Sequence, residues 1–82
     1  MHRVELFKEV QKLLAQILKI NTSEVKEESS LEGDLGLDSV DFWDGIASFR
    51  KKFNIKILES EVANLKTVKD IIDLLEEKKS GK

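Results

Sequence analysis

The sequence predicts an all-α fold, an irregular bundle of four helices with a long loop between the first two helices and a short third helix. Apolar residues recur at helical spacing in three segments, no segment shows the alternation of a strand, and the chain contains no proline. With 82 residues the chain has room for one small core. We therefore expect a single domain over residues 1–82.

The first helix is predicted over residues 3–19, followed by a long polar connection over residues 20–38. Seven apolar residues share one face of this helix: Val4, Phe7, Val10, Leu13, Leu14, Ile17 and Leu18. The connection carries four isolated apolar residues that we expect to anchor it to the core: Val25, Leu31, Leu35 and Leu37. Because so long a connection is uncommon in a compact domain and usually has a function, its end is the first place to look for a site.

The second helix is predicted from Ser39 to about Asn54. Its apolar residues share one broad face: Phe42, Trp43, Ile46, Phe49 and Phe53. The helix opens with acidic residues and closes with Arg50-Lys51-Lys52, a polarity that suits the helix dipole. Gly45 costs about 1 kcal/mol relative to alanine in a helix interior, and nothing in the sequence explains it.

Two further helices complete the predicted bundle. A short helical turn is expected near residues 60–64, and the last helix runs from residue 68 to about Lys78. Thr67 and Asp70 resemble a capping box with Asp in place of Glu at the start of that helix. The last helix carries Val68, Ile71, Ile72, Leu74 and Leu75 on its apolar face.

The residue inventory argues against most enzyme classes. The chain has no cysteine and one histidine, His2, so no catalytic triad and no structural zinc site can be assembled. The acidic residues before Ser39 do not follow the spacing of a calcium loop, and we expect no metal. No apolar run is long enough for a membrane span or follows the basic start as in a signal peptide, which predicts a cytoplasmic or organelle-matrix location.

Residues 24–44 are strongly acidic, with eight carboxylates against the single Lys26. The acids are Glu24, Glu27, Glu28, Glu32, Asp34, Asp38, Asp41 and Asp44. This charge argues against a nucleic-acid partner and favours partners with basic docking surfaces. The alternative is that the segment is an ordinary solvated loop.

The segment Asp34-Leu35-Gly36-Leu37-Asp38-Ser39-Val40 stands where the long loop meets the second helix. It resembles the acyl carrier protein family, whose signature at this junction is Asp-Leu-Gly-x-Asp-Ser-Leu. Residues 30–32, 53–57 and 65–68 also match the family's order of elements, so the resemblance covers nearly the whole chain. It implies a fold of acyl-carrier type and a 4'-phosphopantetheine arm on Ser39, transferred from coenzyme A by a phosphopantetheinyl transferase. A protein of this family carries acyl groups between synthases, ligases and acyltransferases and catalyses nothing itself.

Residues around Ser39 then have expected roles. A phosphodiester on Ser39 would lie at a helix N-terminus, where free N–H groups and the dipole favour negative charge. Asp38 is expected to cap the helix and, by family resemblance, to contribute a metal or recognition contact during transfer of the arm. Gly36 would let the loop turn sharply. Leu37 and Val40 either contact partner enzymes, as the family implies, or pin the loop and helix.

Two further groups of residues are candidates. Asp41 and Asp44 are expected to belong to the acidic docking surface. The inner faces of the second and third helices could open to shelter an acyl chain, or could be ordinary core. The residues concerned are Ile46, Ala47, Ile57, Val62 and Leu65.

Three functions remain open at this point. They are a carrier for fatty acyl or related lipid and polyketide chains, a carrier for aminoacyl or peptidyl groups, and an unmodified helical interaction module. The basic Arg50-Lys51-Lys52 stands where fatty-acid carriers commonly have acids, Leu58 stands where they often have proline, and Phe42 and Trp43 are unusually bulky. These departures indicate a specialised carrier with its own partners, although matching of the helix dipole also accounts for the basic residues. We expect the protein to be a monomer.

Overall fold

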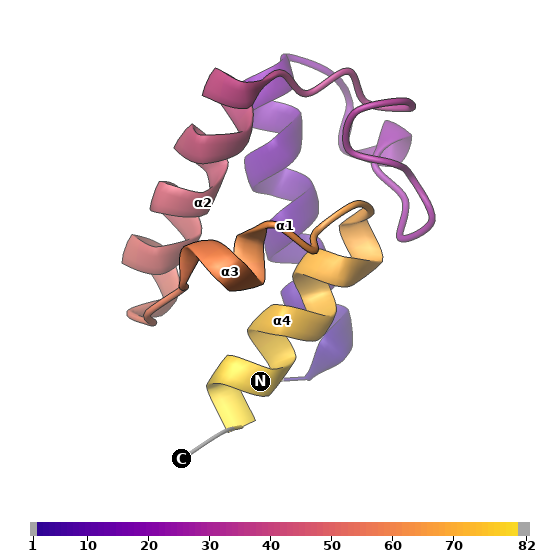
Figure 1. Cartoon of the computed structure of the whole chain (residues 1–82). Coiled ribbons are helices and arrows are strands. Elements are labelled where there is room, and N and C mark those ends of the chain that lie inside the picture. Colours follow the sequence, from indigo (N-terminus) through magenta and orange to yellow (C-terminus); the bar gives the residue numbers. More distant parts are fainter. Residues whose placement is uncertain (1, 81–82) are drawn as a thin grey trace.

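The protein is described by a computed structural model over residues 2–80. Its elements follow in the order α1 (Arg3–Leu18), the 3-10 turn η1 (Thr22–Glu24), α2 (Ser39–Phe53), α3 (Glu59–Val62) and α4 (Val68–Ser80). The short α3 crosses in front of the bundle between α2 and α4 (Figure 1). The predicted four-helix bundle with a long first loop and a short third helix is confirmed, and η1 is an addition within that loop.

Local backbone chemistry sets the ends of the two long helices. Lys19 follows α1 in the left-handed conformation with φ 59°, and its N–H donates to the carbonyl of Ala15. Asn54 follows α2 in the same conformation with φ 53°, and its N–H donates to the carbonyl of Arg50. The predicted end of α2 is confirmed, and α1 ends at Leu18, one residue before its predicted end.

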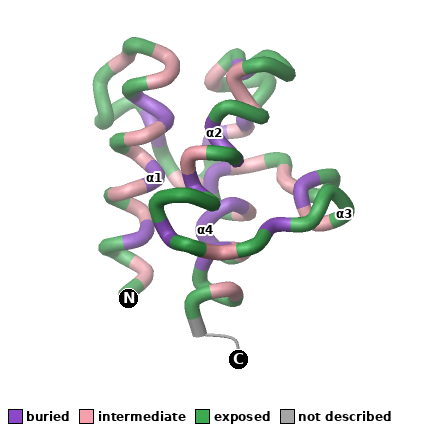
Figure 2. Tube along the Cα trace, turned by 90° about the vertical axis from the view of Figure 1, so that its left-hand side faces the viewer, coloured by how far each residue is buried: buried purple, intermediate pink, exposed green. Residues whose placement is uncertain are grey.

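The buried core joins the inner faces of α1, α2 and α4. Phe49 lies near its centre, 1% exposed, and stacks on Phe53 with the ring centroids 6.4 Å apart. Buried segments of these helices face one another in the tube view (Figure 2). From these helices the core takes Leu6, Val10, Leu14, Ala15, Ile46, Phe49, Phe53, Val68, Ile71, Ile72 and Leu75.

The apolar face of α1 differs from the predicted one at its N-terminal end. Val4 is 64% exposed, whereas Leu6, which the predicted face omitted, is completely buried. The buried stripe follows Leu6, Val10 and Leu14 at four-residue spacing, which places Val4 on the outer side of the helix. The error is one of rotation about the helix axis, because the helix itself is where the periodicity predicts it.

The long loop is anchored to the core by its isolated apolar residues, as predicted. Val25, Leu31 and Leu37 are buried, and Leu35 packs against the core while partly exposed. Backbone hydrogen bonds add to this anchorage: the Leu31 N–H donates to the carbonyl of Lys66 over 2.9 Å. The loop end before α2 is therefore held against the segment that leads into α4.

The start of α4 confirms the predicted capping box. The Thr67 N–H donates to Asp70 Oδ2 over 3.1 Å, and the Asp70 N–H donates to Thr67 Oγ1 over 3.2 Å. The loop satisfies two more donors, because the N–H of Val68 donates to the Ser29 carbonyl over 3.0 Å and that of Lys69 donates to the carbonyl of Glu27. The loop and the first turn of α4 thus form one hydrogen-bonded unit.

Ion pairs tie the helices together at their ends. Arg3 of α1 contacts Glu27 of the loop at 3.0 Å and Asp73 of α4 at 2.7 Å. Hydrogen bonds to these carboxylates, that of Glu27 foremost, raise the pKa of the Arg3 guanidinium above its ordinary value. Near the C-terminal end of α4, Lys78 Nζ lies 2.8 Å from Glu61 of α3. The single turn of α3 is thereby fastened to α4.

Candidate functional site

Ser39 is the first residue of α2 and is exposed. Asp38 precedes it as the N-cap, with extended backbone angles, and its Oδ1 accepts a hydrogen bond from the Asp41 N–H at 2.8 Å. The Asp38 carbonyl also accepts from the Phe42 N–H at 2.9 Å. The predicted capping role of Asp38 is therefore confirmed, and the neighbouring hydroxyl is left facing solvent.

A tightly folded loop brings Ser39 to this position. Ser30 and Asp34 bond reciprocally, each backbone N–H donating to the other's side-chain oxygen over 2.8 Å. Gly36 has φ 69°, the left-handed region that glycine reaches without steric cost, which agrees with the sharp turn expected there. The Leu37 N–H then donates back to the carbonyl of Leu31 at 2.9 Å, which closes the loop just before the cap.

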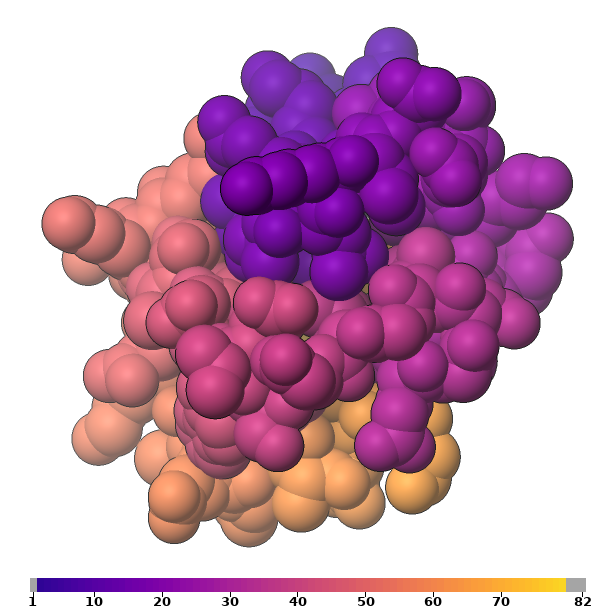
Figure 3. All heavy atoms as spheres, turned by 90° about the horizontal axis from the view of Figure 1, so that it is seen from above, coloured from indigo at the N-terminus to yellow at the C-terminus, as the bar shows by residue number. Residues whose placement is uncertain are grey.

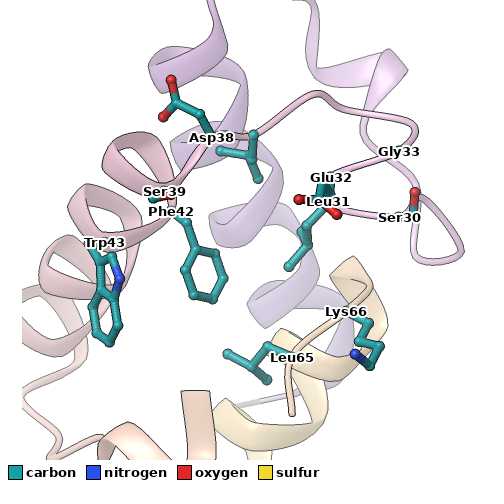
Figure 4. A pocket seen from close by; sticks show the side chains of 11 residues that line it. Ser30, Leu31, Glu32, Gly33, Asp38, Ser39, Phe42, Trp43, Leu65 and Lys66 are labelled. Atoms are coloured by element: carbon teal, nitrogen blue, oxygen red, sulfur yellow. The ribbon is translucent and has the colours of Figure 1, made fainter. Parts of the chain in front are cut away.

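A pocket of about 530 Å³ opens beside Ser39. Two of its walls are the first turns of α2 and, opposite them, the segment between α3 and α4, and the loop over residues 30–37 lines the rest (Figure 4). The Phe42 ring points into the space towards Leu65 in this view. The pocket is lined by Ser30, Leu31, Glu32, Gly33, Leu37, Asp38, Ser39, Phe42, Trp43, Leu65 and Lys66.

Phe42 and Trp43 form the aromatic side of this pocket. Their rings meet edge to face, with centroids 6.0 Å apart and planes at 73°. Phe42 is half-buried, but Trp43 is 46% exposed, so the prediction that Trp43 lies on the core face is wrong. The buried side of α2 is centred on Ile46 and Phe49, which leaves Trp43 at its edge.

The pocket overlaps the predicted acyl cavity at one residue, Leu65. Ile46, Ile57 and Val62 are buried in the core, with 3%, 7% and 4% of their surface exposed. Opening of the core around these three residues stays a prediction. The inward placement of Ala47 is wrong, because Ala47 is exposed on the outer side of α2.

The two apolar residues that flank Ser39 have different surroundings. Leu37 is 6% exposed and belongs to the core, so its side chain pins the loop and offers almost no surface to a partner. Val40 is 68% exposed and remains available for contact. Of the two expected docking acids, Asp44 is exposed and Asp41 is half-buried.

Part of this site could not have been found by pattern analysis. Glu32 and Lys66 line the pocket from segments far apart in the sequence, and they meet because the loop is hydrogen-bonded to the residues before α4. Within residues 2–80, no three His, Cys, Asp or Glu side chains are grouped so that they could hold a metal ion. No helix in the described part of the chain is long and apolar enough to cross a membrane.

The fold and the site together place an exposed serine at the start of a helix beside an open pocket, an arrangement that suits a covalently attached group. Seen from above, the start of α2 lies at the surface beside the loop and α1 (Figure 3). Comparison with known proteins identifies this group. A family model described as the phosphopantetheine attachment site matches residues 8–75.

Relatives with curated names agree with this match. The chain is 34% identical to the acyl carrier protein of Thermotoga maritima over 76 residues, 93% of this chain and 94% of the relative. It is 39% identical to the acyl carrier protein of Porphyromonas gingivalis over 72 residues, 88% of this chain and 92% of the relative. The chain belongs to the acyl carrier protein family.

Solved structures show the same fold. The crystal structure of the Thermotoga maritima acyl carrier protein superposes with a TM-score of 0.81 at 28% identity, covering 95% of this chain and 91% of that one. The apo doublet acyl carrier protein from prodigiosin biosynthesis superposes with a TM-score of 0.79, also at 28% identity. This match covers 95% of our chain and 38% of the doublet.

Family membership makes phosphopantetheine the cofactor and makes the protein a carrier without catalytic activity of its own. The geometry of Ser39 fits such a group, because its side chain is exposed at a helix N-terminus beside a pocket. A phosphopantetheinyl transferase and acyl-processing enzymes are accordingly its partners.

Proposed function

We propose that Ser39 bears the 4'-phosphopantetheine arm and that the arm carries acyl groups as thioesters for the synthesis of fatty acids or related lipids or polyketides. The observation that carries this proposal is the position of Ser39, exposed as the first residue of α2 on the rim of the pocket. The chain contains no cysteine, so the thiol that forms the thioester has to belong to the arm.

The local electrostatics support attachment at this serine. A phosphodiester on Ser39 would add negative charge where the first N–H groups of α2 point out of the helix. The Asp38 carboxylate accepts a hydrogen bond from the Asp41 N–H at 2.8 Å, so the first turn of α2 is already ordered before any arm is added. We propose that Asp38 also contributes to recognition or metal binding by the transferase.

The pocket supports a place for the arm close to the attachment point. Its walls combine apolar surface from Leu65 and Phe42 with polar groups from Glu32 and Lys66. A pantetheine chain has the same mixed character, with apolar carbons between amide groups. The arm and the first part of its cargo would lie here, along the aromatic side of the pocket.

A specialised pathway is favoured over general fatty-acid synthesis by two observations. The end of α2 carries Arg50, Lys51 and Lys52, and one structural neighbour is a carrier from prodigiosin biosynthesis. An aminoacyl or peptidyl carrier would use the same serine and is the alternative. A loading assay distinguishes the two functions. Loading of the holo-protein by an acyltransferase would indicate an acyl cargo, and loading by an adenylating ligase would indicate an aminoacyl cargo.

The test of the attachment site is modification with coenzyme A, magnesium and a phosphopantetheinyl transferase, followed by intact-mass measurement. The wild type should gain one arm and Ser39→Ala none. Ser48→Ala, on the same helix but half-buried, is the matched control and should be modified like the wild type. Modification of the Ser39→Ala variant, or an unmodified wild type, would show that the assignment is wrong.

A further inference from the structure

The outer face of α2 carries apolar surface that no other element covers. Val40 is 68% exposed and Trp43 is 46% exposed, and Ala47 lies one further turn along the same side. We call Val40, Trp43 and Ala47 the apolar stripe. It begins one residue from Ser39. Exposed apolar groups in such a row indicate a surface that contacts another protein.

The charges along this face change sign from one end to the other. Asp41 and Asp44 flank the beginning of the apolar stripe, and Arg50 and Lys51 follow its end. Arg50 and Lys51 are exposed, and within residues 2–80 neither forms an ion pair. The helix rise of 1.5 Å per residue puts about 12 Å between the centres of the acidic and the basic pair.

The last turn of α2 holds three cations, more than complementing the helix dipole requires. Lys52 also lies in the last turn of α2, where one cation already complements the negative end of the helix. Its ammonium group is engaged by Glu9 of α1 at 3.0 Å, and this contact lowers the pKa of the Glu9 carboxyl. Arg50 and Lys51 therefore add positive charge to the outer face beyond what the helix end and the packing against α1 use.

We infer that the outer face of α2 docks an enzyme surface of split polarity. That surface is basic near the opening that receives the arm, has an apolar depression for Trp43, and is acidic about 12 Å further along the helix. The inference rests on the proposed function, because docking here brings the arm on Ser39 to an enzyme. The inference specifies the charge pattern of the partner's surface, which the proposed carrier function does not specify.

Split polarity has two physical consequences for partner choice. Opposite charges at the two ends fix the direction in which α2 lies on the enzyme, since a reversed helix would place like charges together. An enzyme that is basic along its whole docking surface is disfavoured, because it would meet Arg50 and Lys51. Trp43, large and central, is the residue best suited to anchor the contact.

The experiment reverses the basic end and measures kcat/KM with two enzymes. The carriers are the holo-protein, its Arg50→Glu/Lys51→Glu variant and a control with the same change in net charge, Lys8→Glu/Lys79→Glu, at two exposed lysines away from α2. One enzyme is an acyltransferase chosen because its own structure shows a docking surface that is basic throughout. The other is an acyl- or aminoacyl-loading enzyme chosen because its own structure shows a docking surface that is basic at one end and acidic at the other.

The two enzymes should respond in opposite directions. The α2 variant should gain about three- to tenfold with the all-basic enzyme and lose about as much with the enzyme of split polarity, as expected for a few exposed charge pairs. Both effects should shrink as salt is raised. Trp43→Ala should reduce kcat/KM with the enzyme of split polarity at any salt concentration.

Other outcomes overturn the inference. If the α2 variant behaves like the control with both enzymes, Arg50 and Lys51 serve only the helix end. If sedimentation shows a dimer of the wild type that the variant loses, the outer face binds a second copy instead. Failure of the transferase to modify the wild type would count against the proposed function and is measured separately by mass.

Discussion

Gly45 offers a test of the packing between α1 and α2. It is buried in the middle of α2, and a Cβ placed on it would lie 3.5 Å from Ile17 Cδ1 of α1. This is an ordinary van der Waals distance, so the structure has room for a methyl group. The backbone there is helical, and alanine adopts it without strain. Gly45→Ala should therefore stabilise the protein.

The size of the effect follows from two contributions. Replacing glycine by alanine inside a helix is worth about 1 kcal/mol, because alanine loses less backbone entropy on folding. Burial of the methyl group against Ile17 adds up to about 0.8 kcal/mol. For a domain of this size, 1 kcal/mol raises the melting temperature by roughly 4–8 °C. With the two contributions together, we expect an increase of roughly 4–14 °C.

The matched control is the same substitution at Gly36. Among the described residues, no atom lies within 4 Å of a Cβ built there, so no clash arises. Its φ of 69° is unfavourable for an L-residue, and Gly36→Ala should destabilise the protein by roughly 1 kcal/mol. Thermal and urea unfolding followed by circular dichroism measure both variants. A Gly45→Ala variant less stable than the wild type would refute the proposed packing of α1 on α2.

Two further predictions concern the cap of α2 and the fastening of α3. Asp38→Ala should lose the hydrogen bond from the Asp41 N–H and about 1 kcal/mol of stability, whereas Asp38→Asn should keep the cap. If Asp38→Asn unfolds like the wild type but is modified at Ser39 more slowly, the carboxylate has a role in recognition by the transferase. Equal rates of modification in the variant and the wild type would confine Asp38 to capping. The pKa of Glu61 is lowered, chiefly by its hydrogen bond from Lys78, so its contribution to stability is present above the usual carboxyl pKa and lost as the pH falls below it. The wild type should therefore be more stable than Glu61→Gln at pH 7, with the difference shrinking below about pH 4.5 in unfolding curves, and a constant difference would contradict this.

Helix positions could be predicted from the sequence because helical periodicity is a local property. Ser39 and Asn54 mark the beginning and end of α2 through cap chemistry that involves only nearby residues. The rotation of each helix was less predictable. Val4 and Trp43 fall at the edges of broad apolar faces, and which edge is buried depends on the neighbouring helices. Hydrophobic residues at such edges carry no local signal for their final burial.

At the attachment site too, the features set by nearby residues could be predicted and those set by tertiary contacts could not. Asp38 and Ser39 could be placed because a cap and a modifiable hydroxyl are local features of one junction. The opposite wall of the pocket, with Leu65 and Lys66, depends on hydrogen bonds between the loop and the start of α4, which no spacing rule reveals. Ala47 was misplaced because alanine is compatible with either face of a helix.

The two walls of the pocket differ in how firmly they are held. The Ser39 wall belongs to a helix of 15 residues whose first turn is capped by Asp38. The opposite wall is joined to α3, a single turn of four residues that depends on Glu61, whose carboxylate accepts from the Leu58 N–H and pairs with Lys78. Isolated turns of this length have little stability of their own. A cargo that needs more space than the pocket offers should therefore displace the α3 side first, and loss of the pair with Lys78 should make that displacement easier.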